Sequence, residues 1–242
     1  MNRGYKVQSF DREGRENLTS VLKNVKNYMR ALITSGLTYP AKIVIFTLKG
    51  EGPMLAYNQL SGLDLTIIAV TFPSTYSVEL DTGGTYTPEI PEKVVKFFKG
   101  VEIPIVRTRL PFDDITGAES HNQEMAILRK ALGVFGGSIP LAIQAVLQAT
   151  DADLIRPGEE VIAITSDTAL LVTASTTRDF LSQSCGLIVN EIICKPRNFT
   201  ITRPKPKPPP EVLQMPTPTN EKFTTIEGNG NTDGRKFRED GE

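Results

Sequence analysis

Cysteine and histidine are scarce in this chain. Its 242 residues include two cysteines, Cys185 and Cys194, and a single histidine, His121. The cysteines lie too far apart for a Cys-x-x-Cys motif, and no Cys/His cluster has the spacing of a zinc site. We therefore expect reduced, buried thiols and no metal centre.

Strong net charge and long apolar runs are also missing. The formal net charge is −1, with 39% hydrophobic and 23% charged residues. A charge this small gives no reason to expect nucleic acid or an acidic membrane surface as a partner. No apolar run approaches the length of a membrane span, and no N-terminal segment has the regions of a signal peptide. The sequence therefore predicts a cytoplasmic protein.

The chain is organised around the stretch Ala41–Gly62, AKIVIFTLKGEGPMLAYNQLSG. It contains a continuous apolar run, Ile43–Phe46, which is typical of a strand buried on both faces of a parallel sheet. A glycine-bearing turn follows, and Pro53 suits the first position of a helix. Strand, turn and helix in this order point backbone N–H groups and the positive end of a helix dipole at an anion.

The rest of the sequence predicts an alternation of helices and strands. Apolar spacing and capping signals predict helices over residues 16–35, 53–61, 89–99, 123–132, 138–149 and 176–182. Apolar runs predict strands over residues 42–48, 65–71, 102–109, 160–165 and 187–194, the last antiparallel at an edge. Pro104 places the third of these strands at a sheet edge. Residues 72–88 and 111–121 are predicted loops, and the apolar segment 167–174 stays unassigned.

These elements define one α/β domain. Residues 1–13 are predicted to be irregular, residues 14–197 to form the domain, and residues 198–242 to be a disordered, proline-rich tail. Strands that alternate with helices imply a mostly parallel sheet in a three-layer α/β/α sandwich. Such sheets bind ligands beyond the carboxyl ends of their strands, where the strand order reverses.

The turn after the first strand is the leading candidate for a binding site. Thr47 offers a hydroxyl and Lys49 a cation, while Gly50 and Gly52, on either side of Glu51, would let a phosphate oxygen approach the backbone. The turn lacks the GxxxxGK[ST] spacing of a P-loop, and the chain has no GxGxxG. The alternative is that glycines occur in such turns for purely geometric reasons.

A second anion contact is predicted where the helix over residues 138–149 begins. Gly136 and Gly137 precede Ser138, which can cap this helix, so the segment presents free N–H groups. Helix-breaking geometry explains the two glycines equally well.

Polar residues at the ends of other strands are expected at the same edge. The residues predicted to contact the rest of the ligand are Thr71, Thr165, Ser166, Asp167 and Thr168. A solvated turn with self-bonded hydroxyls explains the last four equally well. Arg107 and Arg109, on the third strand, could reach an anion or form a solvated pair at the edge.

The order of these motifs resembles the C-terminal α/β domain of pyruvate kinase. The stretch IVIFTLKGEGPMLAYNQLSGLDLTIIAVT is similar to a segment in which a strand ends in a Thr-x-Ser-Gly-x-Ser/Thr loop, a helix follows, and the next strand ends in Ala-Val-Thr. Thr47, Gly50 and Ala69–Thr71 match that pattern. FGGSIPLAIQAVLQATDADLIRPGEEVIAI and EIICKPR are similar to stand-alone homologues found mostly in archaea and bacteria. The resemblance covers about residues 14–197.

The resemblance implies a five-stranded sheet of order 3-2-1-4-5, with helices on both faces and the last strand antiparallel. In the full enzyme the matching loop holds the phosphate of an allosteric sugar bisphosphate, and flavin mononucleotide (FMN) is the implied occupant in the stand-alone homologues. Here Lys49 replaces the usual serine and Gly52 the usual serine or threonine, so two hydroxyl donors are lost and a cation is gained. The catalytic barrel of the enzyme has no counterpart, so pyruvate kinase activity is not expected.

The resulting hypothesis is a domain that binds a small phosphorylated ligand, with FMN or a sugar phosphate as the class. Two alternatives stay open. One is an enzyme that uses flavin or a phosphorylated metabolite, with His121 or Asp167 as proton carrier. The other is a structural subunit tethered by its proline-rich tail. Assembly into a homo-oligomer stays open as well.

Overall fold

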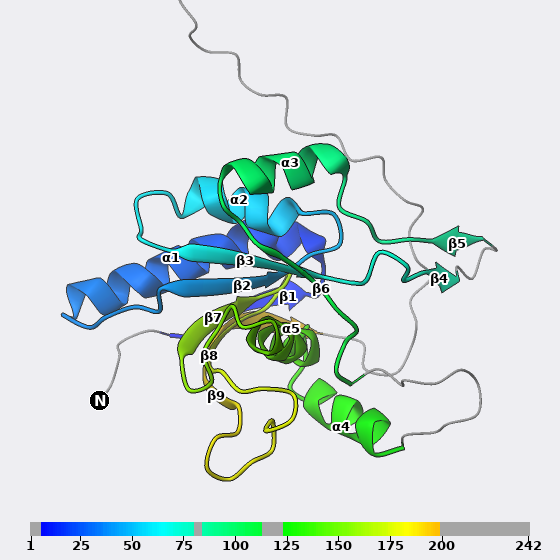
Figure 1. Cartoon of the computed structure of the whole chain (residues 1–242). Coiled ribbons are helices and arrows are strands. Elements are labelled where there is room, and N and C mark those ends of the chain that lie inside the picture. Colours follow the sequence, from blue (N-terminus) through cyan, green and yellow to red (C-terminus); the bar gives the residue numbers. More distant parts are fainter. Residues whose placement is uncertain (1–5, 80–83, 113–122, 199–242) are drawn as a thin grey trace, which may run out of the picture. The chain divides into compact units, whose positions relative to one another are not determined.

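A seven-stranded sheet lies at the centre of the fold (Figure 1). The computed structural model describes residues 6–79, 84–112 and 123–198. The strand order is β1-β9-β8-β7-β2-β3-β6. In chain order the strands are β1 (Gln8–Arg12), β2 (Lys42–Phe46), β3 (Thr66–Thr71), β6 (Ile105–Arg107), β7 (Glu160–Ile164), β8 (Ala169–Thr173) and β9 (Ile188–Asn198). Only β8 runs opposite to the other six, so the predicted α/β class with a mostly parallel sheet is confirmed.

The number of strands differs from the five that were expected. The order β6-β3-β2-β7-β8 reproduces the expected 3-2-1-4-5 arrangement with an antiparallel fifth strand, but that strand is β8, from the segment left unassigned. Its inner residues are buried on both faces, so the sequence carries no alternation to mark it. The strand β9 is not at the edge, because β1 pairs with it from Gln8 opposite Cys194 onward.

Helices cover both faces of the sheet (Figure 1). On one face lie α1 (Leu18–Thr34), α2 (Glu51–Gln59) and α3 (Glu92–Gly100), and on the other α4 (Gln123–Gly133) and α5 (Ile139–Asp151). In β2, Ile43 and Ile45 pack towards α1, α2 and α3, while Val44 and Phe46 pack towards α5. This arrangement is the predicted three-layer sandwich, and it explains why β2 reads as an uninterrupted apolar run.

The long helix α1 forms and ends as its sequence predicts. Its apolar stripe is buried except for Ile33 near the end of the helix, and Tyr28 and Met29 have no exposed surface. Gly36 follows the helix with φ 69°, and its N–H donates to the Ile33 carbonyl at 3.0 Å while the Leu37 N–H donates to the Leu32 carbonyl at 2.9 Å. This pair of bonds is a Schellman motif, in which glycine accepts the left-handed conformation without steric strain.

Three local predictions are wrong. Residues 8–12 form β1 instead of an irregular segment, because β1 is held by main-chain pairing to β9 and its mostly exposed side chains show no apolar pattern. Residues 176–182 form turns instead of a helix, with the Asp179 N–H donating to the Thr176 hydroxyl at 3.2 Å. Helix α2 begins at Glu51 and not at Pro53, because Gly50 serves as its N-cap.

The predicted loops are less uniform than expected. The loop over residues 72–88 contains a two-stranded antiparallel ribbon, β4 (Val78–Glu79) with β5 (Thr85–Tyr86). Pro104 precedes β6 at a sheet edge, as predicted. Residues 113–122 and the predicted tail over 199–242 lie outside the described residues.

Candidate functional site

The carboxyl ends of β2, β3, β6 and β7 meet at one edge of the sheet. The chain leaves β2 towards β3 and β6 in one direction, and β7 lies on the other side of β2. The strand order therefore reverses between β2 and β7, which is where ligands bind in open α/β sheets. Thr47 follows β2 and Thr165 follows β7, so both flank this switch point.

The two glycines of the turn after β2 face the protein core. Gly50 has φ 90°, and a Cβ atom there would lie 2.6 Å from Val94 Cγ1 on α3. A Cβ atom at Gly52 would lie 2.7 Å from Ile45 Cγ2 on β2. Both glycines are thus required for close packing of α2 and α3, which favours the geometric explanation for them.

The first turn of α2 nevertheless keeps two main-chain donors. The Gly50 N–H donates to the Thr47 hydroxyl oxygen at 2.9 Å, and Pro53 has no N–H. The first intrahelical bond runs from the Met54 N–H to the Gly50 carbonyl at 3.2 Å. Within the described part of the chain, the N–H groups of Glu51 and Gly52 have no acceptor.

Three charged side chains belong to this turn or pair with it. Arg15 Nη2 lies 2.7 Å from Glu51 Oε1, and Lys49 Nζ lies 5.6 Å from the centre of the Tyr86 ring. Burial raises the pKa of Tyr86, and the negative charge of Glu51 raises it further. Two cations therefore flank the start of α2, and one of them neutralises its only acidic side chain in the first turn.

The start of α5 is already occupied by a carboxylate of the chain itself. Asp167, which is 3% exposed, accepts hydrogen bonds from the Ser138 N–H at 3.3 Å and from the Thr168 hydroxyl at 2.9 Å. Its other oxygen accepts from the Gly14 N–H at 3.2 Å. The Thr168 oxygen also accepts from the Ser138 N–H at 3.1 Å, and a Cβ atom at Gly137 would lie 2.5 Å from that oxygen. The second anion contact predicted at Gly136, Gly137 and Ser138 is thus internal to the protein.

Residues 165–168 form the hairpin turn between β7 and β8. The Thr165 N–H donates to the Thr168 carbonyl at 2.9 Å, and Thr165 is 2% exposed. The turn is self-bonded, as the structural alternative predicted, but it is buried and not solvated. Ser166 is the only residue of the four that is not fully buried.

A segment that sequence reasoning missed links the two helix starts. Gly14 bonds to Asp167 at α5, and the next residue, Arg15, pairs with Glu51 at α2. Residues 14–15 therefore bridge the β7–β8 turn and the first turn of α2. No periodicity marks this segment, because its contacts are one main-chain bond and one exposed ion pair.

Thr71 and Arg107 come together at the ends of β3 and β6. They are in register, Thr71 has no exposed surface, and its Oγ1 atom has no hydrogen-bond partner in the described residues. The Nη1 atom of Arg107 is also buried and has no hydrogen-bond partner in the described residues. Arg109 is exposed, whereas Arg107 is half-buried. The two arginines therefore differ in exposure, unlike the predicted pair of solvated arginines.

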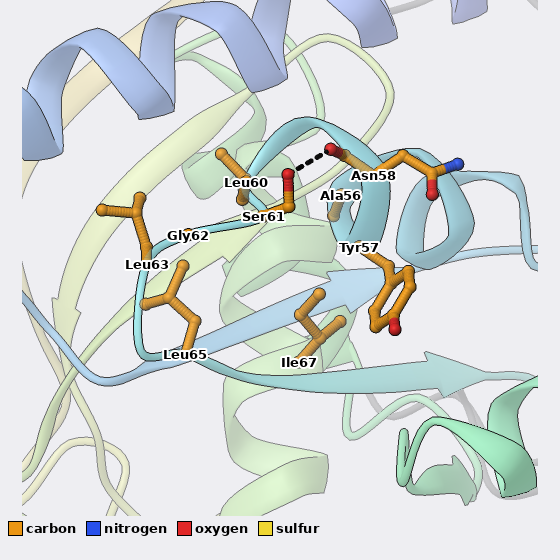
Figure 2. Close-up of a pocket in the computed structure, with 9 residues that line it drawn as sticks. All are labelled: Ala56, Tyr57, Asn58, Leu60, Ser61, Gly62, Leu63, Leu65 and Ile67. Atoms are coloured by element: carbon orange, nitrogen blue, oxygen red, sulfur yellow. Dashed lines mark hydrogen bonds between the residues drawn. The ribbon is translucent and has the colours of Figure 1, made fainter.

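A surface cavity lies away from this edge, beside the last turn of α2 and the start of β3 (Figure 2). Its volume is about 380 Å³, and its lining is mostly apolar, with Leu63, Leu65 and Ile67 pointing into it. The Ser61 hydroxyl donates to the Asn58 carbonyl at 3.0 Å. None of the sequence-predicted site residues lines this cavity.

Both cysteines are free thiols. Cys194 is buried, and burial raises its pKa to about 12, which leaves it unreactive as a nucleophile. Cys185 is exposed, so the expectation that both thiols are buried is wrong for this residue. His121 lies outside the described residues.

Over residues 6–79, 84–112 and 123–198, no group of three or more His, Cys, Asp or Glu side chains could hold a metal ion. No helix in the same ranges has the length and apolar character needed to cross a bilayer. No protein-family model matches the chain.

Replacing Gly50 by alanine tests the packing role of the turn. We expect a loss of about 2–4 kcal/mol in the free energy of unfolding, because the left-handed φ and the clash with Val94 add together. The matched control is Gly62→Ala, where φ is 88° and no atom lies within 4 Å, so that only the backbone strain of about 1–2 kcal/mol remains. Equal losses in urea denaturation of the two variants would contradict the packing role.

Replacing Asp167 by alanine tests the internal cap of α5. The variant leaves the Ser138 and Gly14 N–H groups without their acceptor, so we expect a loss of about 1–3 kcal/mol in the free energy of unfolding. Asp64→Ala, at an exposed position, serves as control and should change stability by less than about 0.5 kcal/mol. A loss no larger than that of the control would show that the carboxylate does not cap the helix.

Proposed function

We propose that the chain binds a small phosphorylated ligand of the FMN or sugar-phosphate class at the carboxyl edge of its sheet, without pyruvate kinase activity. The observation that carries the proposal is the pair of N–H groups of Glu51 and Gly52, which have no acceptor in the described part of the chain. They lie at the positive end of the α2 dipole, where phosphate oxygens accept hydrogen bonds from backbone amides.

The surrounding charges support a dianionic group at this position. Lys49 directly precedes Gly50, the N-cap of α2, and supplies a cation to the same turn. The carboxylate of Glu51 would repel a phosphate, but its ion pair with Arg15 offsets that charge. The turn thus has two main-chain donors and a net positive character in spite of its acidic residue.

The comparison with α5 separates two of the helices that begin at this edge. Both helices begin at the carboxyl edge, yet Asp167 already supplies the anion at α5. A ligand phosphate at α5 would have to displace a buried carboxylate held by three donors. The start of α2 needs no such displacement, so it is the site we assign to the phosphate.

The enzymatic alternative draws less support from the geometry. Asp167, one of its two proton carriers, has both carboxylate oxygens engaged by main-chain or hydroxyl donors. That engagement favours a structural role for the carboxylate over proton transfer. The other carrier, His121, and the tail of the tether alternative lie outside the described residues.

Replacing Lys49 by glutamate tests the phosphate site. The change turns an attraction into a repulsion, so affinity for FMN and for glucose 6-phosphate should fall by about 2–4 kcal/mol in isothermal titration calorimetry. Lys130→Glu, with the same charge change at an exposed position on α4, should leave both affinities unaltered. If Lys49→Glu binds as tightly as the unmodified protein, the phosphate does not lie at this turn.

A further inference from the structure

At the carboxyl edge, three adjacent strands carry a row of apolar side chains and, beyond it, a row of polar side chains. Ile45, Ala69 and Ile105 are in register on β2, β3 and β6 and pack towards the same face. Two residues further along these strands come Thr47, Thr71 and Arg107. Side chains two apart on a strand share a face, so this second row lies on the face of α2 and α3.

The main-chain hydrogen bonds of the sheet extend into this polar row. The Thr47 N–H donates to the Val70 carbonyl at 2.9 Å, which extends the β2–β3 ladder one residue beyond β2. Thr71 pairs directly with Arg107 in the β3–β6 ladder. The row is therefore fixed by main-chain pairing and not by the side chains themselves.

Two members of the row hold buried polar atoms without partners. Thr71 is 0% exposed, and neither its Oγ1 nor Arg107 Nη1 bonds to any described residue. Arg107 as a whole is half-buried, although its Nη1 atom is covered. The third atom of this kind, Gln148 Oε1, belongs to α5 on the opposite face and is not part of the row.

From these observations, and resting on the proposed phosphate site at α2, we propose that Thr71 and Arg107 form a second subsite that binds a carboxylate of the same ligand. The ligand class is then a short phosphorylated sugar acid, which shares its phosphate ester with the sugar phosphates. A carboxylate has two oxygens, and one can accept from Arg107 Nη1 while the other accepts from the Thr71 hydroxyl. Both unpartnered atoms are then satisfied by one planar group.

The charge of this subsite matches a carboxylate better than a second phosphate. Arg107 makes no ion pair with any described residue, so its single positive charge is available to one negative charge. A phosphate dianion would leave one negative charge unbalanced in a buried position, which is strongly unfavourable.

The spacing of the strands sets the length of the ligand. Thr47 Oγ1 lies 2.9 Å from the N-cap nitrogen of α2, next to the proposed phosphate position. Thr71 is one strand further, at a distance of about 5 Å, and Arg107 one strand beyond that. A chain of about three carbon atoms, the carboxylate carbon included, spans this distance from the phosphate.

The test compares two probes that share a phosphate and differ in the carboxylate. Affinities of the full chain for 3-phosphoglycerate and glycerol 3-phosphate are measured by calorimetry, with Thr71→Val and Arg107→Met as variants. We expect the unmodified protein to bind 3-phosphoglycerate at least tenfold more tightly, and each variant to lose most of this ratio while it keeps its affinity for glycerol 3-phosphate. Thr66→Val, at an exposed position of the same strand, should keep the ratio.

The outcomes separate the two proposals. If glycerol 3-phosphate binds but the ratio is near one, or if the ratio survives in both variants, the carboxylate subsite is wrong and the phosphate site stands. If neither probe binds, the phosphate site fails and the subsite fails with it.

Thermal unfolding of the ligand-free protein gives an independent readout. Thr71→Val removes a buried hydroxyl that has no partner and keeps the side-chain shape, so its midpoint should rise, whereas Thr66→Val should not show this rise. A lower midpoint for Thr71→Val would mean that the hydroxyl bonds within the protein, and this result would overturn the proposal.

Discussion

A helix that begins at the edge of a buried sheet must find acceptors for its first N–H groups, and this constraint shapes the carboxyl edge of the fold. Helices α2 and α5 are two of the helices that begin there, and each brings a partial positive charge to the same region. The chain places the carboxylate of its own Asp167 against the N-cap amide of α5, whereas the amides of Glu51 and Gly52 at α2 bond to no acceptor in the described residues. The functional proposal follows from this difference between two otherwise similar helix starts.

The open donors are one part of a larger set of unsatisfied groups on the same face. A buried polar atom without a partner costs about 1–3 kcal/mol, which is a sizeable fraction of the 5–15 kcal/mol that stabilises a typical domain. Thr71 Oγ1 and Arg107 Nη1 both bear this cost in the ligand-free protein. A ligand that supplies acceptors to them would recover that free energy on binding. The unpaired atoms thus lower the stability of the ligand-free protein and raise its affinity for the ligand.

The sequence predicts the centre of this fold better than its margins. The strands β2, β3 and β7 and the helix α1 are found close to their expected bounds, because their burial leaves a clear apolar pattern. The strand β1 has no such pattern, since it is held by main-chain bonds with mostly exposed side chains. The sequence does not assign β8, because a strand buried on both faces cannot be told from a helix by periodicity alone.

The candidate site shows a similar division. The sequence places Thr47 and Thr71 at the carboxyl edge, where the structure has them, because a strand's carboxyl end can be recognised in the sequence. The sequence leaves two explanations for the glycines of the turn, anion binding and close packing. Only the short distances from a Cβ atom added at Gly50 to Val94, and at Gly52 to Ile45, separate the two. The role of Asp167 at α5 depends on contacts between segments far apart in the chain, so no local pattern could reveal it.

The most direct test of the central claim observes the amide groups at both helix starts during one titration. Inorganic phosphate is added to ¹⁵N-labelled protein, and the amide resonances are followed by NMR. We expect the Glu51 and Gly52 resonances to shift with saturation, while those of Ser138 and Gly14, already bonded to Asp167, stay in place. Shifts at Ser138 and Gly14 without shifts at Glu51 and Gly52 would contradict this expectation.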